Sequence, residues 1–349
     1  MKLSAAVVVL VSVAGLSQAP QFHSGVQLIT LNVSVLDKSG NAVTDLRPSD
    51  FSVLVDGKPR VVRFAQLFHS ERSPIVVSSD HSLGRYATNT DAPTGHVVVF
   101  AIDRYALPPG TERPILTSAA GMLDRLSLAD SVGLVNIPGT TIDVTRDHPL
   151  IARALESIVG MSQPGMSQRS VTWPEAKAID AGDNLVLAQV VERECLSPDD
   201  SYCQQDIHTA VRETLGYGRE HADMVLASLT SIVNHLAVIR APKHIVLLSA
   251  GLPFDTEFLD RFKAVERAAA QSHVTIDTIR VHTFAADATS PVKGGVAPEG
   301  TADRAGLDTL ASLTGGTAFL ASGRDTGIFT RLISQVTTFY QLGVESSAS

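Results

Sequence analysis

Aromatic residues make up only 5% of the chain, and 28 lysines and arginines stand against 36 aspartates and glutamates. So few aromatic side chains argue against a surface on which bases stack. The net charge of −8 argues against a nucleic-acid partner, which needs a basic surface. Hydrophobic residues are plentiful, at 44%, and are mostly valine, leucine, isoleucine and alanine. This composition is typical of a buried β-sheet flanked by helices.

No apolar run is long enough to span a bilayer. The strongest candidate lies at the N-terminus, where Lys2 precedes an apolar stretch over residues 5–16. That stretch is too short for a membrane-spanning helix, and Ser17-Gln18-Ala19 after it is a small-x-small cleavage site. Residues 1–19 therefore predict a signal peptide and an exported protein (periplasmic, cell-surface or secreted) with no transmembrane span after cleavage. A buried N-terminal strand is the alternative.

Cysteine occurs only twice, as Cys195 and Cys203. The seven residues between them do not match a CxxC redox motif. In an exported protein such a pair is typical of a local disulfide, which we predict here. A zinc site would need two further ligands; His208 and His221 lie downstream, but without the spacing of a zinc finger.

The pattern of the chain changes near residue 96. Residues 26–66 alternate apolar and polar side chains around turns such as Asp56-Gly57, which predicts a small β module. Residues 67–95 are polar and rich in turn-forming residues, and predict a linker. Over residues 96–345 buried strands alternate with helices, which predicts an α/β fold with a doubly wound, mostly parallel, Rossmann-like sheet. A β/α barrel is the alternative, but it needs eight strand–helix units and we count six.

Residues 160–218 fit this alternation least well, and we interpret them as an insertion. Residues 161–183 are expected to be irregular and residues 184–194 to be helical. The single tryptophan, Trp173, lies in the irregular part, where it is a possible partner contact. Alternatively, Trp173 folds back over the sheet. Because loops on a rigid scaffold commonly carry recognition, a partner is expected at this insertion and at the adjoining Asp103 loop.

Several stretches share the order and spacing of one family's motifs. They are VQLITLNVSVLDKSGNAVTDLRPSDFSVLVDGKPRVV near the N-terminus, then LASLTSIVNHLAVIRAPKHIVLLSAGLP, TLASLTGGTAFLAS and SQVTTFYQLGVES. Together they resemble a bacterial von Willebrand factor A-related domain protein of the kind first noticed in Acidobacteria. The resemblance implies an exported protein with a small β module in front of a von Willebrand A-like domain, used for binding rather than catalysis.

Adhesive domains of this type imply a Mg²⁺ or Mn²⁺ site built by three loops, which carry Asp-x-Ser-x-Ser, a Thr and an Asp. Here Asp103 keeps the first position, but Tyr105 and Leu107 stand at the two serine positions. The strand KHIVLLSAG ends in Ser249 and Ala250, so alanine replaces the third-loop aspartate. Because a hard cation needs several oxygen ligands, we expect a degenerate site without a cofactor.

The other positions of such a metal site have only weak candidates. Thr145 and Thr172 are weak candidates for the second-loop threonine, Asp103 is a weak candidate for a metal ligand, and Mg²⁺ is the ion we would consider there. We expect Asp103 to bond backbone amides of its own loop, or to pair with a cation such as Arg104.

Catalytic motifs are incomplete. The stretch around Ser249 keeps only the second half of Gly-x-Ser-x-Gly, and Asp103-Arg104-Tyr105 lacks the second carboxylate of Asp-x-Asp. The expected function is therefore a non-catalytic, adhesion- or scaffold-type module that binds an unknown protein. The alternative is a hydrolase of unknown substrate, with a pocket around Asp103 and Ser249.

Overall fold

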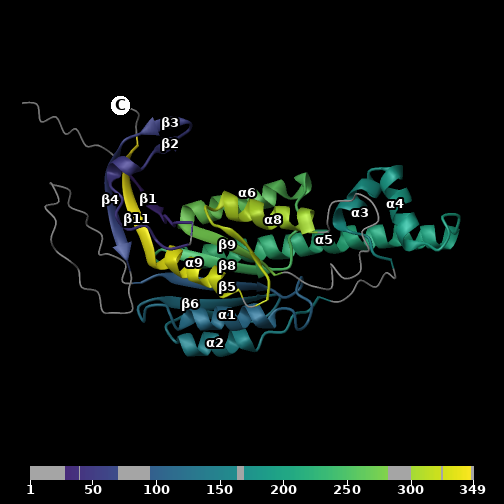
Figure 1. The fold of residues 1–349 in the computed structure, drawn as a ribbon, viewed down its shortest axis with the longest axis horizontal. Coiled ribbons are helices and arrows are strands. Elements are labelled where there is room, and N and C mark those ends of the chain that lie inside the picture. The colour runs from purple at the N-terminus through teal and green to yellow at the C-terminus, as the bar shows by residue number, and fades with distance from the viewer. Residues whose placement is uncertain are drawn as a thin grey trace, which may run out of the picture. The chain divides into compact units, whose positions relative to one another are not determined.

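The computed structural model describes residues 28–38, 40–69, 95–162, 169–281, 300–323 and 325–346 (Figure 1). The predicted signal peptide and most of the predicted linker lie outside these ranges. The chain divides into two compact units. The smaller consists of Met1–Asn32, Leu46–Gln66 and Gln341–Ser349, and the larger of Val33–Asp45 and Leu67–Tyr340. In the described ranges, no helix combines the length and the apolarity that a membrane span requires.

The larger unit is built on a six-stranded sheet whose central strand is β5 (Val97–Asp103), buried along its whole length. The strand order is β10-β9-β8-β5-β6-β7. All neighbours pair in parallel except β7, which runs antiparallel to β6 at one edge. The other strands are β6 (Ser131–Ile137), β7 (Thr141–Thr145), β8 (Lys243–Ser249), β9 (Val274–Val281) and β10 (Ala318–Ala321). The predicted doubly wound α/β architecture is confirmed, and the barrel alternative is wrong because the sheet is open.

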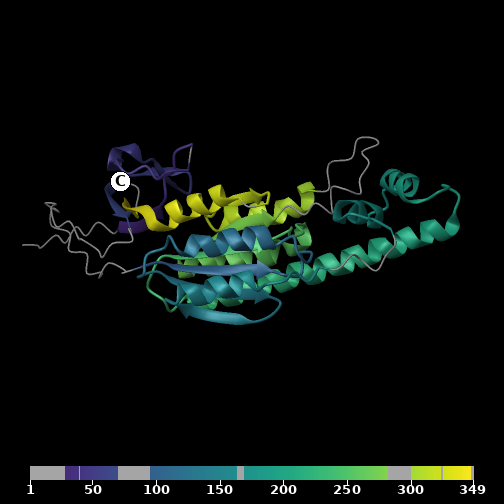
Figure 2. The ribbon, with the colours of Figure 1, turned by 60° about the horizontal axis from the view of Figure 1, so that its bottom comes forward.

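Helices cover both faces of this sheet, as Figures 1 and 2 show. Successive residues of a strand point to opposite faces, so Val98, Phe100 and Ile102 enter one apolar core and Val97 and Val99 the other. On the first face lie α1 (Arg113–Leu123), α2 (His148–Glu156) and α9 (Thr326–Thr337). On the second lie α5 (Ser201–Leu236), α6 (Leu259–Ser272) and α8 (Gly300–Leu313).

The predicted insertion is more regular than expected. Residues 173–180 form a helix, α3 (Trp173–Asp180), where an irregular segment was predicted. The physical reason is a capping box: the Thr172 hydroxyl accepts from the amide of Glu175, and the Glu175 carboxylate accepts from the amide of Thr172. The next helix, α4 (Asn184–Glu194), lies where it was predicted. The predicted disulfide between Cys195 and Cys203 is present, with Cα atoms 5.9 Å apart.

Two small sheets complete the fold. The predicted hairpin is formed by β2 (Val53–Val55) and β3 (Lys58–Arg60), with Asp56 and Gly57 at φ values of 52° and 73°. The three-stranded sheet has the order β1-β11-β4. Its strands are β1 (Leu28–Val33), β11 (Thr338–Glu345) and β4 (Val62–His69). The last strand of the chain therefore pairs with strands from the N-terminal region instead of extending the six-stranded sheet.

Candidate functional site

The strand order identifies the place where this architecture binds ligands. From β5 the chain proceeds outward through β6 and β7, and from β8 it proceeds outward in the opposite direction. In doubly wound sheets the ligand site lies at the carboxyl ends of the two strands where the order reverses. Asp103 is the last residue of β5 and Ser249 is the last residue of β8, and both are fully buried.

Asp103 is the centre of a hydrogen-bonded cluster. Its Oδ2 accepts from the hydroxyl of Ser249 at 2.6 Å and from Nε2 of His221 at 2.7 Å. Its Oδ1 accepts from the backbone amide of Ala106 at 3.3 Å. The Ser249 oxygen in turn accepts from the amide of Gly251 at 3.1 Å. A carboxylate this deeply buried needs such donors, because an unpaired buried charge costs several kcal/mol.

The histidine in this cluster was not predicted from the sequence. His221 lies in α5, 118 residues from Asp103 along the chain, and is 3% exposed. Arg104, the cation expected to pair with Asp103, instead donates from Nε to the carbonyl of Val159 at 2.8 Å. We predicted that Asp103 bonds backbone amides of its own loop, and the bond from the amide of Ala106 is of this kind. A signal for His221 did exist: it lies one helical turn before Val225 on the apolar stripe of α5.

The residues at the two serine positions have other roles. The Tyr105 ring stacks on that of Tyr217, with centroids 4.8 Å apart and planes 10° from parallel. The Tyr217 hydroxyl donates to the carbonyl of Tyr105 at 2.8 Å. Burial raises the pKa of Tyr217 to about 12, and the nearby Tyr105 and Asp103 contribute to the increase. Leu107 is fully buried in the core on the α1 face.

These residues do not fit a divalent ion. Asp103 accepts three hydrogen bonds, and Ala250 brings no side-chain oxygen; its carbonyl accepts from Nε of Arg280 at 3.3 Å. Thr172 caps α3, and the hydroxyl of Thr145 accepts from the amide of Asp147. Mg²⁺ requires an almost octahedral set of oxygens. Within the described ranges, no three side chains of His, Cys, Asp or Glu are grouped so that they could hold a metal ion.

The cluster contains a serine, a histidine and an aspartate, but in a different order from that of a hydrolase triad. In a triad the histidine bonds the serine hydroxyl and the aspartate bonds the far side of the histidine. Here both Ser249 and His221 donate to Asp103, so the carboxylate lies between them. No contact between Ser249 and a base other than Asp103 is seen among the described residues.

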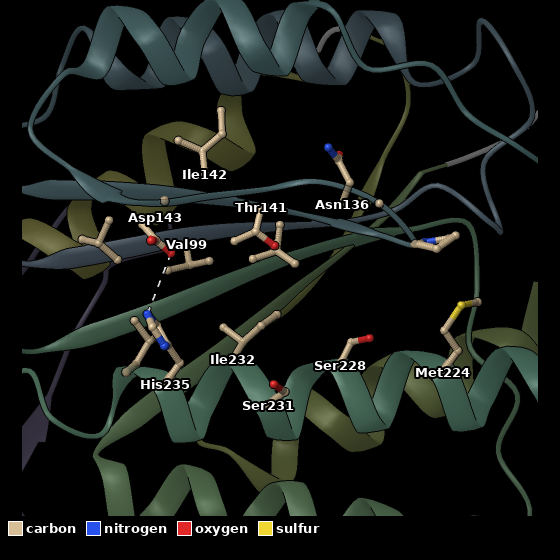
Figure 3. A pocket seen from close by; sticks show the side chains of 16 residues that line it. Val99, Asn136, Thr141, Ile142, Asp143, Met224, Ser228, Ser231, Ile232 and His235 are labelled. Atoms are coloured by element: carbon tan, nitrogen blue, oxygen red, sulfur yellow. Dashed lines mark ion pairs between the residues drawn. The ribbon is translucent and has the colours of Figure 1, made fainter.

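A cavity of about 420 Å³ lies elsewhere on the larger unit, between α5 and the strands β6 and β7 (Figure 3). Its lining does not include Asp103, His221 or Ser249. Gly133 of β6 is part of the lining, and an added Cβ there would lie 3.4 Å from the side chains of Val99 and Val144. Across the cavity, His235 of α5 and Asp143 of β7 come within 3.9 Å of each other, and both are largely exposed. The lining combines apolar and polar side chains: Val99, Val135, Val144, Met224, Ser228, Ser231 and Ile232.

Trp173 is 7% exposed and packs inward. Its ring lies over Gly218 of α5, where an added Cβ would come within 2.3 Å of the indole. The Trp173 ring centroid is 6.0 Å from that of Phe258, and Nζ of Lys177 lies 5.9 Å from it. Of the two alternatives for Trp173, the structure shows inward packing, although onto α5 rather than onto the sheet. Trp173 therefore does not offer the exposed ring that an anchor for a partner requires.

A bidentate ion pair joins α3 to α4. Nη1 and Nη2 of Arg193 bond the two carboxylate oxygens of Glu175 at 2.6 and 3.1 Å. Burial alone would raise the pKa of Glu175, but the bonds from Arg193 and from the amide of Thr172 outweigh it and hold that pKa below its usual value. Helices α3 and α4 thus form an ordered extension of the domain, which packs on α5 and is stabilised by the Glu175–Arg193 ion pair.

No protein-family model matches the chain, and no curated protein matches it. Among solved structures, the chain is similar to an aerotolerance-related membrane protein from Bacteroides fragilis NCTC 9343, with 14% identity, a TM-score of 0.36, and coverage of 69% of this chain and 98% of that chain. It is also similar to the N-terminal domain of TFIIH p34, with 15% identity, a TM-score of 0.26 and coverage of 69% and 97%. A third similar structure is the VWA domain of SpRpn10, with 10% identity, a TM-score of 0.28 and coverage of 67% and 93%.

Proposed function

We propose that the chain is an exported, non-catalytic protein-interaction module of von Willebrand A type, which binds its partner without a metal ion. The observation that supports this proposal is the saturation of Asp103. In an ion-dependent adhesion site the strand-end carboxylate must be open to the ion. Here Ser249, His221 and the amide of Ala106 occupy its oxygens, and the carboxylate is fully buried. The motifs of the resemblance and the N-terminal apolar segment support the rest of the proposal.

The experiment is an affinity capture with the mature chain from an extract of the organism that carries the gene, performed in Mg²⁺ and again in EDTA. Any retained protein is then purified, and its binding to the chain is measured in both buffers. The proposal predicts the same dissociation constant in both. A partner whose affinity collapses in EDTA would contradict the ion-independent mechanism, and the absence of any partner that binds in purified form would contradict the interaction role.

A second candidate function is supported by one specific observation. Asp103, His221 and Ser249 are the three residue types of a serine hydrolase, and they meet at the ligand-binding end of the sheet. A hydrolase would require His221 to move from Asp103 to the Ser249 hydroxyl when substrate binds. A panel of generic ester substrates tests this candidate, with Ser249→Ala as the variant. Hydrolysis that disappears in Ser249→Ala would favour it over the interaction module.

A further inference from the structure

Among the described residues of the insertion, the most exposed apolar side chains lie in the loop that the disulfide closes, here called the cystine loop (residues 195–203). Leu196 is fully exposed and Tyr202 is 81% exposed. Leu196 follows Cys195 and Tyr202 precedes Cys203, so the disulfide holds both side chains at the base of one loop. Figures 1 and 2 show α4 and the start of α5, which flank this loop, beyond the end of the six-stranded sheet.

The shape of the cystine loop is fixed by its disulfide, by the buried Cys203 and by polar bonds, while Leu196 and Tyr202 remain exposed. Oδ1 of Asp200 accepts from the amides of Tyr202 and Cys203 and caps α5. The amide of Asp200 donates to the carbonyl of Ser197, and Nε2 of Gln204 donates to that of Pro198 at 2.6 Å. A loop ordered in this way lowers the entropic cost of ordering the backbone when a partner binds Leu196 and Tyr202.

The surroundings of the cystine loop are acidic. Residues 192–206 contain five acidic side chains and one basic side chain, Arg193, which is already paired with Glu175. The exposed acidic side chains include Glu192 and Asp199, and also Asp206, which lies 3.8 Å from Nη2 of Arg169. An apolar centre with a charged rim is the usual arrangement of a binding surface, and tyrosine is among the residues that most often dominate binding energy. The complementary surface is a basic one with an apolar pocket.

We propose that the cystine loop is the docking surface of this chain, and that its partner is a protein with a basic surface around an apolar pocket that receives Tyr202 and Leu196. This proposal rests on the proposed function, because it locates the interaction surface of the same module. The acidic rim accelerates association by electrostatic attraction, and the two apolar side chains determine how long the complex lasts. The acidic rim also disfavours an anionic membrane.

The test begins with a photo-reactive probe. p-Benzoylphenylalanine is placed in the full chain at position 196 or 202, and, as matched controls, at Leu128 or Val238, which are 77% and 85% exposed on other parts of the domain. The proteins cross-linked only from the cystine loop are identified and purified. Their binding to the chain is then measured for the wild type, Leu196→Ser, Tyr202→Ser and Asp199→Lys, with Leu128→Ser and Val238→Ser as controls.

We expect Tyr202→Ser to weaken binding by about tenfold or more and Leu196→Ser by a smaller factor, while both control variants bind like the wild type. Asp199→Lys should lower the association rate, with a smaller effect at high salt. Binding of the purified partner that is unchanged in Tyr202→Ser and Leu196→Ser would overturn the proposal. So would Tyr202-dependent binding to neutral lipid vesicles, or Tyr202-dependent dimerisation in sedimentation, since either would identify a different occupant.

The outcomes also separate this proposal from the proposed function. Cross-links from position 128 or 238 alone, confirmed by binding of the purified partner, would leave the interaction module standing and refute the cystine loop. No partner from any of the four positions would refute both.

Discussion

The hydroxyl of Ser249 donates a 2.6 Å hydrogen bond to the carboxylate of Asp103 and so joins the ends of the two central strands, β8 and β5. His221 reaches the same oxygen from α5. The three side chains are almost completely buried, so their donors and acceptors depend on one another rather than on water. This cluster occupies the position at which the architecture would bind a ligand.

Substitution of Asp103, the shared acceptor of the cluster, should lower the free energy of unfolding more than substitution of Ser249, one of its donors. Asp103→Ala removes the acceptor that the buried His221 and Ser249 share, and leaves the Ser249 hydroxyl only the carbonyl of Gly251 at 2.8 Å; we expect a loss of about 3–5 kcal/mol in the free energy of unfolding. Ser249→Ala removes the hydrogen bond to Asp103 and the one from the amide of Gly251, and we expect a smaller loss of about 1–2 kcal/mol. Urea denaturation measures both. The double variant should lose less than the sum of the two, because the sites share one bond. If the loss in the double variant equalled the sum of the two single losses, Asp103 and Ser249 would not be coupled as the cluster requires.

Two glycines of α5 provide a matched pair for the packing of Trp173. An added Cβ at Gly218 would come within 2.3 Å of the indole, whereas at Gly216 it would meet nothing within 4 Å. Gly216→Ala should therefore stabilise the helix by about 0.5–1 kcal/mol. Gly218→Ala should destabilise the protein by about 1–3 kcal/mol, because the ring has to move. Thermal melting and Trp173 fluorescence check both; equal effects of the two substitutions would show that the ring does not lie on Gly218.

The Glu175–Arg193 pair predicts a specific acid sensitivity. Because the folded-state pKa of Glu175 is lowered, its contribution is fully present above its ordinary pKa and is lost as the pH falls through the folded-state value. Glu175→Gln should cost about 1.5–3 kcal/mol near neutral pH, and the difference from the wild type should shrink in strong acid. Urea denaturation over an acid pH series measures this. Glu192→Gln, at an exposed position of the same helix as Arg193, is the control and should change little at any pH. If the loss of unfolding free energy in Glu175→Gln did not change with pH, it would not arise from the Glu175–Arg193 ion pair.

Much of the fold could be predicted from the sequence because the sheet is buried on both faces. Apolar runs such as Val97–Asp103 and Lys243–Ser249 indicate the central strands. Between the strands, apolar residues at helical spacing indicate helices, and so the alternation of strands and helices could be predicted. The helix α3 was missed because the proline and glycine signals around it outweighed its capping box, Thr172-x-x-Glu175. The pairing of β11 with β1 and β4 was not predicted, since it joins the two ends of the chain and no local pattern encodes it.

The candidate site was predicted only in part. Asp103 and Ser249 end their strands, and the carboxyl ends of parallel strands lie at one edge of the predicted sheet, but that β5 and β8 are neighbours was not predicted. His221 comes from a helix far along the chain, and the register of that helix against the sheet is set by tertiary packing. A polar residue on the apolar stripe of α5 was the available clue.

In the proposed function, the cluster of Asp103, His221 and Ser249 takes the place of a divalent ion. The most direct measurement is the thermal melting of the mature chain after dialysis against EDTA, with and without added Mg²⁺. The melting temperature should be the same in both conditions, for the wild type and for Asp103→Asn. A large Mg²⁺-dependent rise in the melting temperature of the wild type that is absent in Asp103→Asn would contradict the proposed function.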